Sequence, residues 1–296
     1  MSILVTGSTG KIGSKVVAQL AQRGMAVRAL TRSPEKAQFP AGVVAVKGDL
    51  LDTDAMRAAL EGVSTLFLLV PNDADELTQA INTLSLAREA GVKGIVYLSV
   101  TRSDQYADVP HFTAKYAVER MIEALQLPAT ILRPSYFMQN DVMLLGVLQG
   151  AGIYPSPVGE KGVSMVDVDD IAAAAVIELV RRERASGPLP RKLVELSGPE
   201  ALTGPQIAQI WSDVLGREVR YGGGDLESFE KQMRAAAPAW KAYDMRAMFR
   251  RYQQDGAVAS REQLDQLTEL LGRPPRSYRE FAQVTAQVRT SRPTSP

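Results

Sequence analysis

The chain has 296 residues, of which 45% are hydrophobic and 23% are charged, as in globular proteins that bury a sizeable core. Its 34 basic and 33 acidic residues leave a formal net charge of +1, which gives no electrostatic footprint for nucleic acid or an acidic membrane. No cysteine is present and His111 is the one histidine, which excludes disulfide bonds, thiol nucleophiles and metal sites built on cysteine or several histidines. The start, MSILVTGSTG, is unlike a signal peptide, and no apolar run reaches the roughly 18 residues of a membrane span. We expect a cytoplasmic protein that takes a small-molecule substrate, binds neither nucleic acid nor membrane, and is a monomer or homodimer.

The first half of the chain alternates short apolar runs with stretches whose apolar residues recur at helical spacing. The stretch before Gly62 begins at a helix cap provided by Asp52 or Thr53. Strands that alternate with helices predict an α/β fold with a Rossmann-type, doubly wound parallel sheet, because right-handed crossovers place helices on both faces. The predicted strands are residues 3–6, 26–31, 43–47, 65–70, 95–99 and 129–133, and the later helices are residues 75–90 and 113–125.

After Pro134 this alternation gives way to a mostly helical pattern. Residues 163–168 predict a strand, and Asp169 or Asp170 is expected to cap an alanine-rich helix that runs through Val180. The remaining predicted elements are a strand at 193–197, a helix from Thr203 to Gly216, a short strand at 218–221, and helices from Leu226 onward.

The sequence GSTGKIG, residues 7–13, joins the first predicted strand to the first helix. In a dinucleotide site, Gly7 permits the tight turn, Gly10 lets the backbone approach a pyrophosphate, and Gly13 lets the helix pack closely on the strand. The helix N-terminus adds N–H groups and the positive end of its dipole. The alternative is an ordinary strand-to-helix turn, but the flanking strands and helix provide the context that a dinucleotide site requires. The predicted cofactor contacts in this turn are Gly7, Ser8, Thr9, Gly10, Lys11, Ile12 and Gly13.

The second strand ends at Thr31-Arg32-Ser33, where an NAD site usually offers an acidic residue to the ribose. An arginine there can pair with a 2′-phosphate, to which a hydroxyl adds a hydrogen bond and Lys11 adds positive charge. The alternative is that Arg32 is a solvated surface charge. The sequence therefore predicts NADP as the cofactor, with NADPH favoured over NADH.

Further cofactor contacts are expected where later strands end, because open parallel sheets bind ligands at their carboxyl edge. Asp49 follows the third strand, where it either meets the exocyclic amine of adenine or serves as a turn residue. Tyr136 and Phe137 follow the sixth strand and either wall an aromatic substrate or belong to the core. Trp240 lies on a helical face that is a candidate for lining the substrate cleft, although such faces more often pack. The predicted cofactor contacts at these strand ends are Asp49, Leu50, Val70, Pro71, Ser99, Pro134 and Tyr136.

The ordered set GSTGKIG, TRS, GDL, DVDDIA and ELSGPEALTGPQIA resembles the NmrA-like atypical short-chain dehydrogenase/reductase family. The segment LLGRPPRSYREF is similar to the one that closes its bacterial members, so the resemblance covers nearly the whole chain. It implies a Rossmann domain that binds NAD(P) and a smaller, mostly helical domain that closes a substrate cleft. Members include quinone, azo-dye and triphenylmethane reductases, and also regulators that bind the dinucleotide without catalysis.

From these patterns we expect two domains. Residues 1–135 would form the NAD(P)-binding domain, to which residues 160–197 return. Residues 136–159 and 198–290 would form the smaller substrate-cleft domain, and residues 291–296 a flexible tail.

Ordinary short-chain dehydrogenases carry Tyr-x-x-x-Lys, in which the lysine assists a tyrosine that exchanges a proton with the substrate. This chain reads His111-Phe112-Thr113-Ala114-Lys115, so the lysine is present and the tyrosine is replaced. Tyr116 points about 100° away on a helix and cannot substitute. The resemblance implies that Lys115 holds the nicotinamide ribose, although an ion pair with Glu119 one turn on is the alternative. His111 is either a proton donor or a polar residue without chemistry.

The missing tyrosine argues against alcohol dehydrogenase, epimerase and dehydratase chemistry. The leading hypothesis is an NAD(P)H-dependent reductase that transfers hydride to a small quinone-like, azo or aromatic acceptor, which accepts hydride without prior protonation. The alternative is a non-catalytic redox sensor that binds NAD(P). A third hypothesis is a lyase or ether-reductase activity in which Lys115 acts as acid and base.

Overall fold

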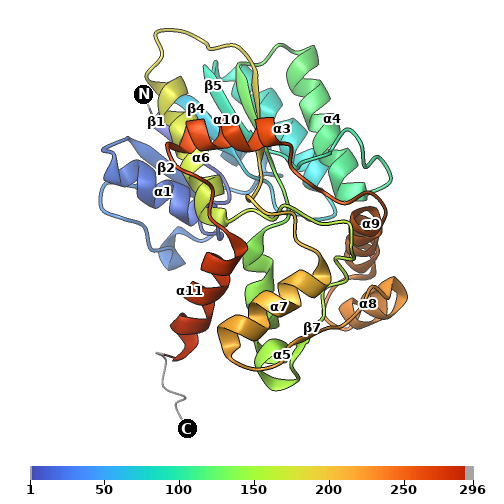
Figure 1. Ribbon diagram of the computed structural model, residues 1–296. Coiled ribbons are helices and arrows are strands. Elements are labelled where there is room, and N and C mark those ends of the chain that lie inside the picture. Colours follow the sequence, from blue (N-terminus) through green and yellow to red (C-terminus); the bar gives the residue numbers. More distant parts are fainter. Residues whose placement is uncertain (1, 291–296) are drawn as a thin grey trace. The chain divides into compact units, whose positions relative to one another are not determined.

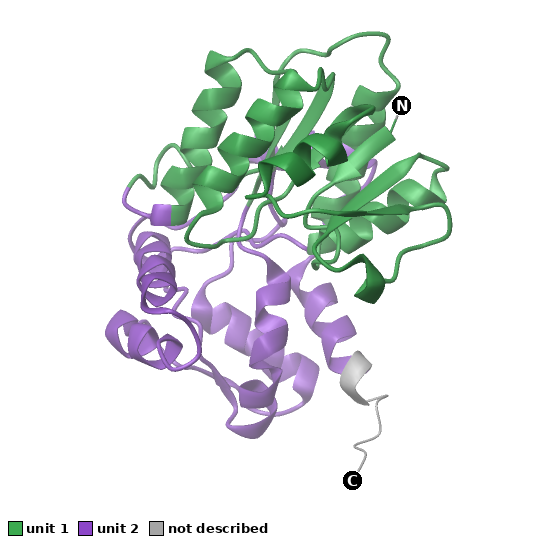
Figure 2. Ribbon diagram, turned by 180° about the vertical axis from the view of Figure 1, so that it is seen from behind, with its two compact units in different colours: residues 1–107, 111–134, 168–195 green, residues 108–110, 135–167, 196–296 purple. Residues whose placement is uncertain are grey.

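The computed structural model describes residues 2–290, and the predicted tail of residues 291–296 lies outside this range. The chain folds as two compact units, coloured separately in Figure 2. Of the described residues, unit 1 contains those up to Ala107, His111–Pro134 and Val168–Glu195. Unit 2 contains Asp108–Pro110, Ser135–Asp167 and the residues from Leu196 onward. The segment that returns to unit 1 is thus residues 168–195, somewhat shorter than the expected 160–197.

Unit 1 is built on a seven-stranded sheet with the order β3-β2-β1-β4-β5-β6-β8. Figure 1 labels its strands β1, β2, β4 and β5. The ladders from β3 through to β6 are all parallel. The chain moves outward from β1 to β3 and then starts again on the other side at β4, which is the doubly wound Rossmann order and confirms the predicted fold. The strands are β1 (Ser2–Val5), β2 (Val27–Thr31), β3 (Val44–Lys47), β4 (Val63–Leu68), β5 (Gly94–Leu98), β6 (Ala129–Pro134) and β8 (Lys192–Leu196).

Helices cover both faces of this sheet, which is why its central strands β4, β5 and β6 are buried along almost their whole length. On one face, α1 (Gly13–Gln22) packs against α6 (Val168–Glu183), and α6 contacts β1, β4, β5 and β6. The other face has an apolar core to which α2 (Thr53–Leu60), α3 (Glu76–Glu89) and α4 (Pro110–Ala124) contribute residues such as Met56, Leu84 and Ile122.

The helix ends follow local chemistry, with one departure from expectation. Asp52 caps α2 by accepting a hydrogen bond from the Ala55 N–H at 3.0 Å, which settles the choice between the two predicted caps. α6 begins at Val168, so Asp169 and Asp170 lie inside its first turn and the prediction that they cap it was wrong. Acidic side chains in a first turn are favourable there because they face the positive end of the helix dipole.

Unit 2 is mostly helical, as predicted. Its helices are the 3₁₀ helix η2 (Met138–Leu144), α5 (Leu145–Gly150), α7 (Gly204–Leu215), α8 (Leu226–Met233), α9 (Ala239–Asp255), α10 (Arg261–Leu271) and α11 (Tyr278–Thr290). A two-stranded sheet pairs β7 (Ile153–Tyr154) with β9 (Arg220–Tyr221). None of the helices in the described part of the chain is long and apolar enough to cross a membrane.

The predicted strand at residues 163–168 is wrong. Val163 forms isolated bridges with Leu202 and Ala257, whereas Val166 bridges Phe137. Because neighbouring positions pair with different segments, no ladder extends far enough to make a strand.

A buried polar cluster lies in the core of unit 2. Asp141 is completely buried, and its Oδ2 accepts hydrogen bonds from the hydroxyls of Tyr154 at 3.0 Å and Tyr278 at 2.5 Å. The Trp211 indole N–H donates to the Tyr278 hydroxyl at 3.0 Å. The other carboxyl oxygen of Asp141 has no hydrogen-bond partner among residues 2–290. The cluster joins η2, β7, α7 and α11, because each contributes one of these side chains.

Candidate functional site

The turn between β1 and α1 assigns a different task to each of its three glycines. Gly7 has φ of +59°, and a Cβ there would lie 2.6 Å from Leu69 Cδ2, so only glycine fits without strain. A Cβ on Gly13 would lie 2.1 Å from the Gly7 carbonyl oxygen, because the start of α1 packs directly on the turn. Around Gly10, which is exposed, the one atom of the described chain within 4 Å of such a Cβ is that same oxygen, at 3.2 Å. The turn is therefore tight at both ends and open at Gly10, where a pyrophosphate would need to approach.

Two hydroxyls fix this turn to the neighbouring strands. The buried Ser8 hydroxyl donates to the Leu30 carbonyl in β2 at 2.7 Å. Thr6 Oγ1 donates to the Leu69 carbonyl at 2.8 Å and accepts from the Leu69 N–H at 2.9 Å. The Ser8 side chain therefore has a structural role, and a contact of Ser8 with a cofactor would have to come from its backbone. The flanking Thr9 and Lys11 are exposed.

The end of β2 presents an unpaired guanidinium. Arg32 is exposed and has no hydrogen-bond or ion-pair partner within residues 2–290. Beside it, the Ser33 backbone N–H donates to Thr31 Oγ1 at 3.3 Å. Asp49, after β3, accepts a hydrogen bond from the Leu51 N–H at 3.0 Å, which is the turn role considered for it. Its contact with adenine remains a prediction.

Lys115 in α4 is not paired with Glu119, so that alternative was wrong. Its ammonium pairs with Glu76, the first residue of α3, and the two side chains are only 12% and 5% exposed. The spacing of one helical turn did not show that Glu119 is buried, with 1% of its surface exposed, where it pairs with other residues. His111 is half-buried, and its ring packs edge-on against Phe112 with the ring centroids 4.7 Å apart.

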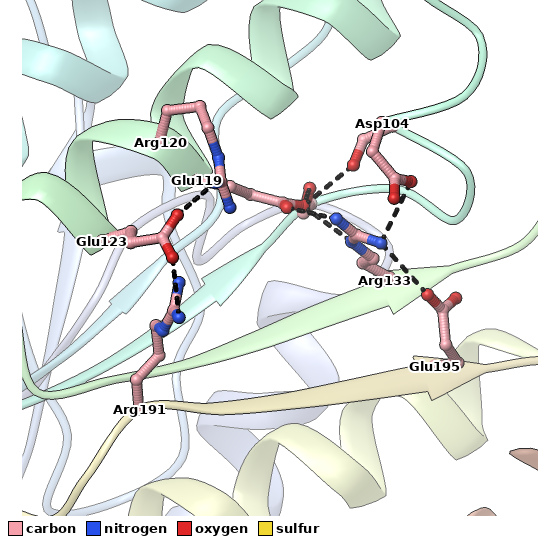
Figure 3. A network of polar contacts seen from close by, with 9 residues as sticks. Asp104, Glu119, Arg120, Glu123, Arg133, Arg191 and Glu195 are labelled. Atoms are coloured by element: carbon pink, nitrogen blue, oxygen red, sulfur yellow. Dashed lines mark hydrogen bonds and ion pairs between the residues drawn. The ribbon is translucent and has the colours of Figure 1, made fainter.

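Glu119 is the centre of a buried polar network at the ends of β5, β6 and β8 (Figure 3). Arg133 in β6 donates to both oxygens of Glu119, at 3.0 and 2.5 Å, and lies 3.3 Å from Asp104 and 3.5 Å from Glu195. Burial acts to lower the pKa of Arg133, but the hydrogen bonds and charge of Glu119 outweigh it and raise that pKa. Burial also raises the pKa of Glu195.

The hydroxyl of Ser99, one of the predicted cofactor contacts, belongs to the same network. Ser99 Oγ donates to Glu119 at 2.5 Å, and Ser103 Oγ donates to the same oxygen at 3.1 Å. The hydroxyl proton of Ser99 is therefore already used in a hydrogen bond within the protein. Sequence reasoning missed this network, although a signal was present: Arg133 stands at the end of the apolar run ATILRP, and a charge at a buried strand position needs a partner.

The predicted substrate residues Tyr136, Phe137 and Trp240 all belong to unit 2. Tyr136 is half-buried in an aromatic cluster, with its ring centroid 5.8 Å from that of Phe249 and 6.3 Å from that of Tyr252. Trp240 is 39% exposed, and the Lys241 ammonium lies 5.8 Å from the centroid of its ring. Their contact with a substrate remains a prediction.

Comparison with known proteins decides the family. The model of the NmrA-like family matches residues 1–282, which is nearly the whole chain. The chain belongs to the NmrA-like family. The NAD(P)H azoreductase of Xenophilus azovorans is 32% identical over 289 residues, which cover 96% of this chain and 98% of the relative. The (4-alkanoyl-5-oxo-2,5-dihydrofuran-3-yl)methyl phosphate reductase of Streptomyces griseus is also 32% identical over 289 residues, with 97% and 98% covered.

Among solved structures, the triphenylmethane reductase of Citrobacter sp. matches with a TM-score of 0.83 and 25% identity, covering 97% of this chain and 100% of that one. The same reductase has been solved in complex with NADP(H). All three of these relatives are named as reductases, which confirms the expected class, an oxidoreductase of an NAD(P)H-dependent family. Which of the predicted side chains contact the cofactor remains a prediction.

Proposed function

We propose that this NmrA-like protein is an NADPH-dependent reductase of a small quinone-like, azo or aromatic acceptor. The observation that carries the proposal is the glycine turn, which is closed by protein atoms at Gly7 and Gly13 and open at Gly10. It stands after β1, beside the point where the strand order reverses, and that is where open α/β sheets bind dinucleotides.

Three features of unit 1 fit the parts of NADPH. The turn and the N-terminus of α1 suit the pyrophosphate, because their N–H groups and dipole attract an anion. The unpartnered guanidinium of Arg32 suits the 2′-phosphate, which NADH lacks. The Lys115 ammonium, held in a largely buried position by Glu76, suits the hydroxyls of the nicotinamide ribose.

The acceptor class follows from what α4 lacks. When bound, the reduced nicotinamide supplies a hydride, so the protein's task is to orient the reactants and exclude water. No tyrosine stands one helical turn before Lys115, where His111 is found instead. A quinone, an azo compound or a cationic aromatic dye accepts a hydride without simultaneous protonation by a phenol, whereas an aldehyde or ketone benefits from it. The likeness to an azoreductase and a triphenylmethane reductase supports this choice.

Steady-state oxidation of NADPH, measured with quinones, azo dyes, cationic triphenylmethane dyes and aldehydes as acceptors, tests the proposal. We expect turnover with the first three groups and little with aldehydes. Tight NADPH binding without turnover on any acceptor would contradict the reductase assignment and favour a sensor that binds NAD(P).

Calorimetric titration with NADPH and NADH tests the cofactor preference. Arg32→Ala should weaken NADPH binding about tenfold to a hundredfold, because a charge-assisted contact contributes roughly 1.5–3 kcal/mol, and should leave NADH binding nearly unchanged. Arg23→Ala, which removes an exposed arginine at the far end of α1, is the matched control and should affect neither cofactor. Equal affinity of the unmodified protein for both cofactors would disprove the preference.

A further inference from the structure

The ion pair between Glu76 and Lys115 joins two helices of unit 1 near the carboxyl edge of the sheet. Glu76 opens α3, which follows β4, and Lys115 lies in the second turn of α4, which follows β5. Both side chains are nearly buried, at 5% and 12% exposed. Within the described range, residues 2–290, Glu76 is the one hydrogen-bond or ion-pair partner of Lys115.

This arrangement leaves Lys115 with unused hydrogen-bonding capacity. An ammonium group has three N–H donors, of which Glu76 takes one. Two donors therefore remain for a ligand.

The carboxylate of Glu76 stabilises Lys115 in its nearly buried position. A nearly buried ammonium without a counter-charge is costly and is relieved when the side chain turns out to solvent. That change would withdraw the two donors from the position in which the helices hold them.

We propose that Glu76 is the positioning residue for the nicotinamide half of the site, where its carboxylate holds the Lys115 ammonium in place so that the remaining donors of Lys115 hold the hydroxyls of the nicotinamide ribose. The inference rests on the proposed function, since it assigns Glu76 a task in that same site. Glu76 itself touches Lys115 and acts on the ligand only through it.

Two ligands distinguish this role from a merely structural one. NADPH contains the nicotinamide ribose, whereas adenosine 2′,5′-bisphosphate carries only the adenosine half of the cofactor. Glu76→Gln and Lys115→Met should each weaken NADPH binding about tenfold in calorimetric titration and leave the adenosine bisphosphate affinity unchanged. Both changes together should cost no more than Lys115→Met alone, because the two residues act as one unit.

Glu89→Gln is the matched control, since Glu89 ends the same helix in a half-exposed pair with Arg57 and should affect neither ligand. Equal losses for both ligands, or full NADPH affinity of Glu76→Gln, would overturn the inference and leave the reductase proposal standing. If the unmodified protein binds neither ligand, the proposed function is wrong and the inference falls with it.

A second comparison covers the case in which Glu76→Gln does not fold. Glu76→Leu combined with Lys115→Met replaces the buried pair by apolar groups, which proteins tolerate well. NADPH affinity equal to that of Lys115→Met alone supports the inference. A further loss would show that Glu76 acts independently of Lys115 and would overturn it.

Discussion

Replacing Asp141 by asparagine should remove a pH dependence from the stability of unit 2. Burial raises the pKa of Asp141 to about 7, against the opposing hydrogen bonds from Tyr278 and Tyr154, whereas an unperturbed aspartate has a pKa of 3.8. Because the pKa is higher in the folded chain, the folded state retains a proton that the unfolded state has lost. The contribution of Asp141 to the free energy of unfolding is therefore complete below pH 3.8 and is lost as the pH rises to about 7. The whole difference is about 4 kcal/mol, at about 1.4 kcal/mol per pH unit.

Urea unfolding followed by tryptophan fluorescence measures this effect locally. In a Trp240→Phe background the signal comes from Trp211, whose N–H donates to the Tyr278 hydroxyl that in turn donates to Asp141. Between about pH 5 and about pH 8 the background protein should lose about 3 kcal/mol of its free energy of unfolding through this group. The same protein with Asp141→Asn should lack that loss, because an amide does not titrate.

The control for this experiment is Asp213→Asn in the same unit. The hydrogen bond from Arg279 lowers the pKa of Asp213, so this carboxylate titrates below the range of the experiment. Its pH profile should run parallel to that of the background protein. The reasoning is refuted if the profile with Asp141→Asn also runs parallel, since the buried carboxyl would then carry no extra proton.

The other predictions concern unit 1. Gly10→Val should fold but fail to bind NADPH in calorimetric titration, whereas Gly13→Val should unfold at lower temperature, because its Cβ would lie 2.1 Å from a backbone oxygen of the turn. A folded Gly10→Val with full affinity would disprove the pyrophosphate assignment. Glu119→Gln should lower the free energy of unfolding by about 3–5 kcal/mol in urea, since it strips the buried Arg133 of its main counter-charge; a loss under about 1 kcal/mol would contradict this. His111→Phe should barely change NADPH oxidation by a quinone, and inactivity with every acceptor would show that the histidine is an obligatory acid.

The sheet could be predicted from the sequence because its signals are local. Each predicted strand of the first half overlaps an observed one, since β-branched runs between glycines and helix caps have few other ways to bury their side chains. The tasks of Gly7 and Gly13 were also predictable, because a tight turn followed by a helix requires the absence of a Cβ at those positions.

The polar partners could not be predicted, because they are chosen by tertiary packing. Lys115 has Glu119 one turn away in its own helix, yet its partner comes from α3, 39 residues earlier in the chain. Spacing along a helix says which residues share a face and does not say whether that face meets solvent or core. The prediction of a strand at residues 163–168 was wrong for the same reason, since its β-branched residues pair with three separate parts of the chain.

The late return of the chain to unit 1 bears on how this protein is synthesised. The first six strands are complete at Pro134, but the helix that covers β1, β4, β5 and β6 on one face begins only at Val168. A nascent chain that has reached Pro134 therefore has its glycine turn but only α1 on this face, so most of the face is still uncovered, the kind of apolar surface on which chaperones act and aggregates form. A fragment cut at that point would fail as an isolated nucleotide-binding module, and the smallest one that buries its sheet must include residues 168–195.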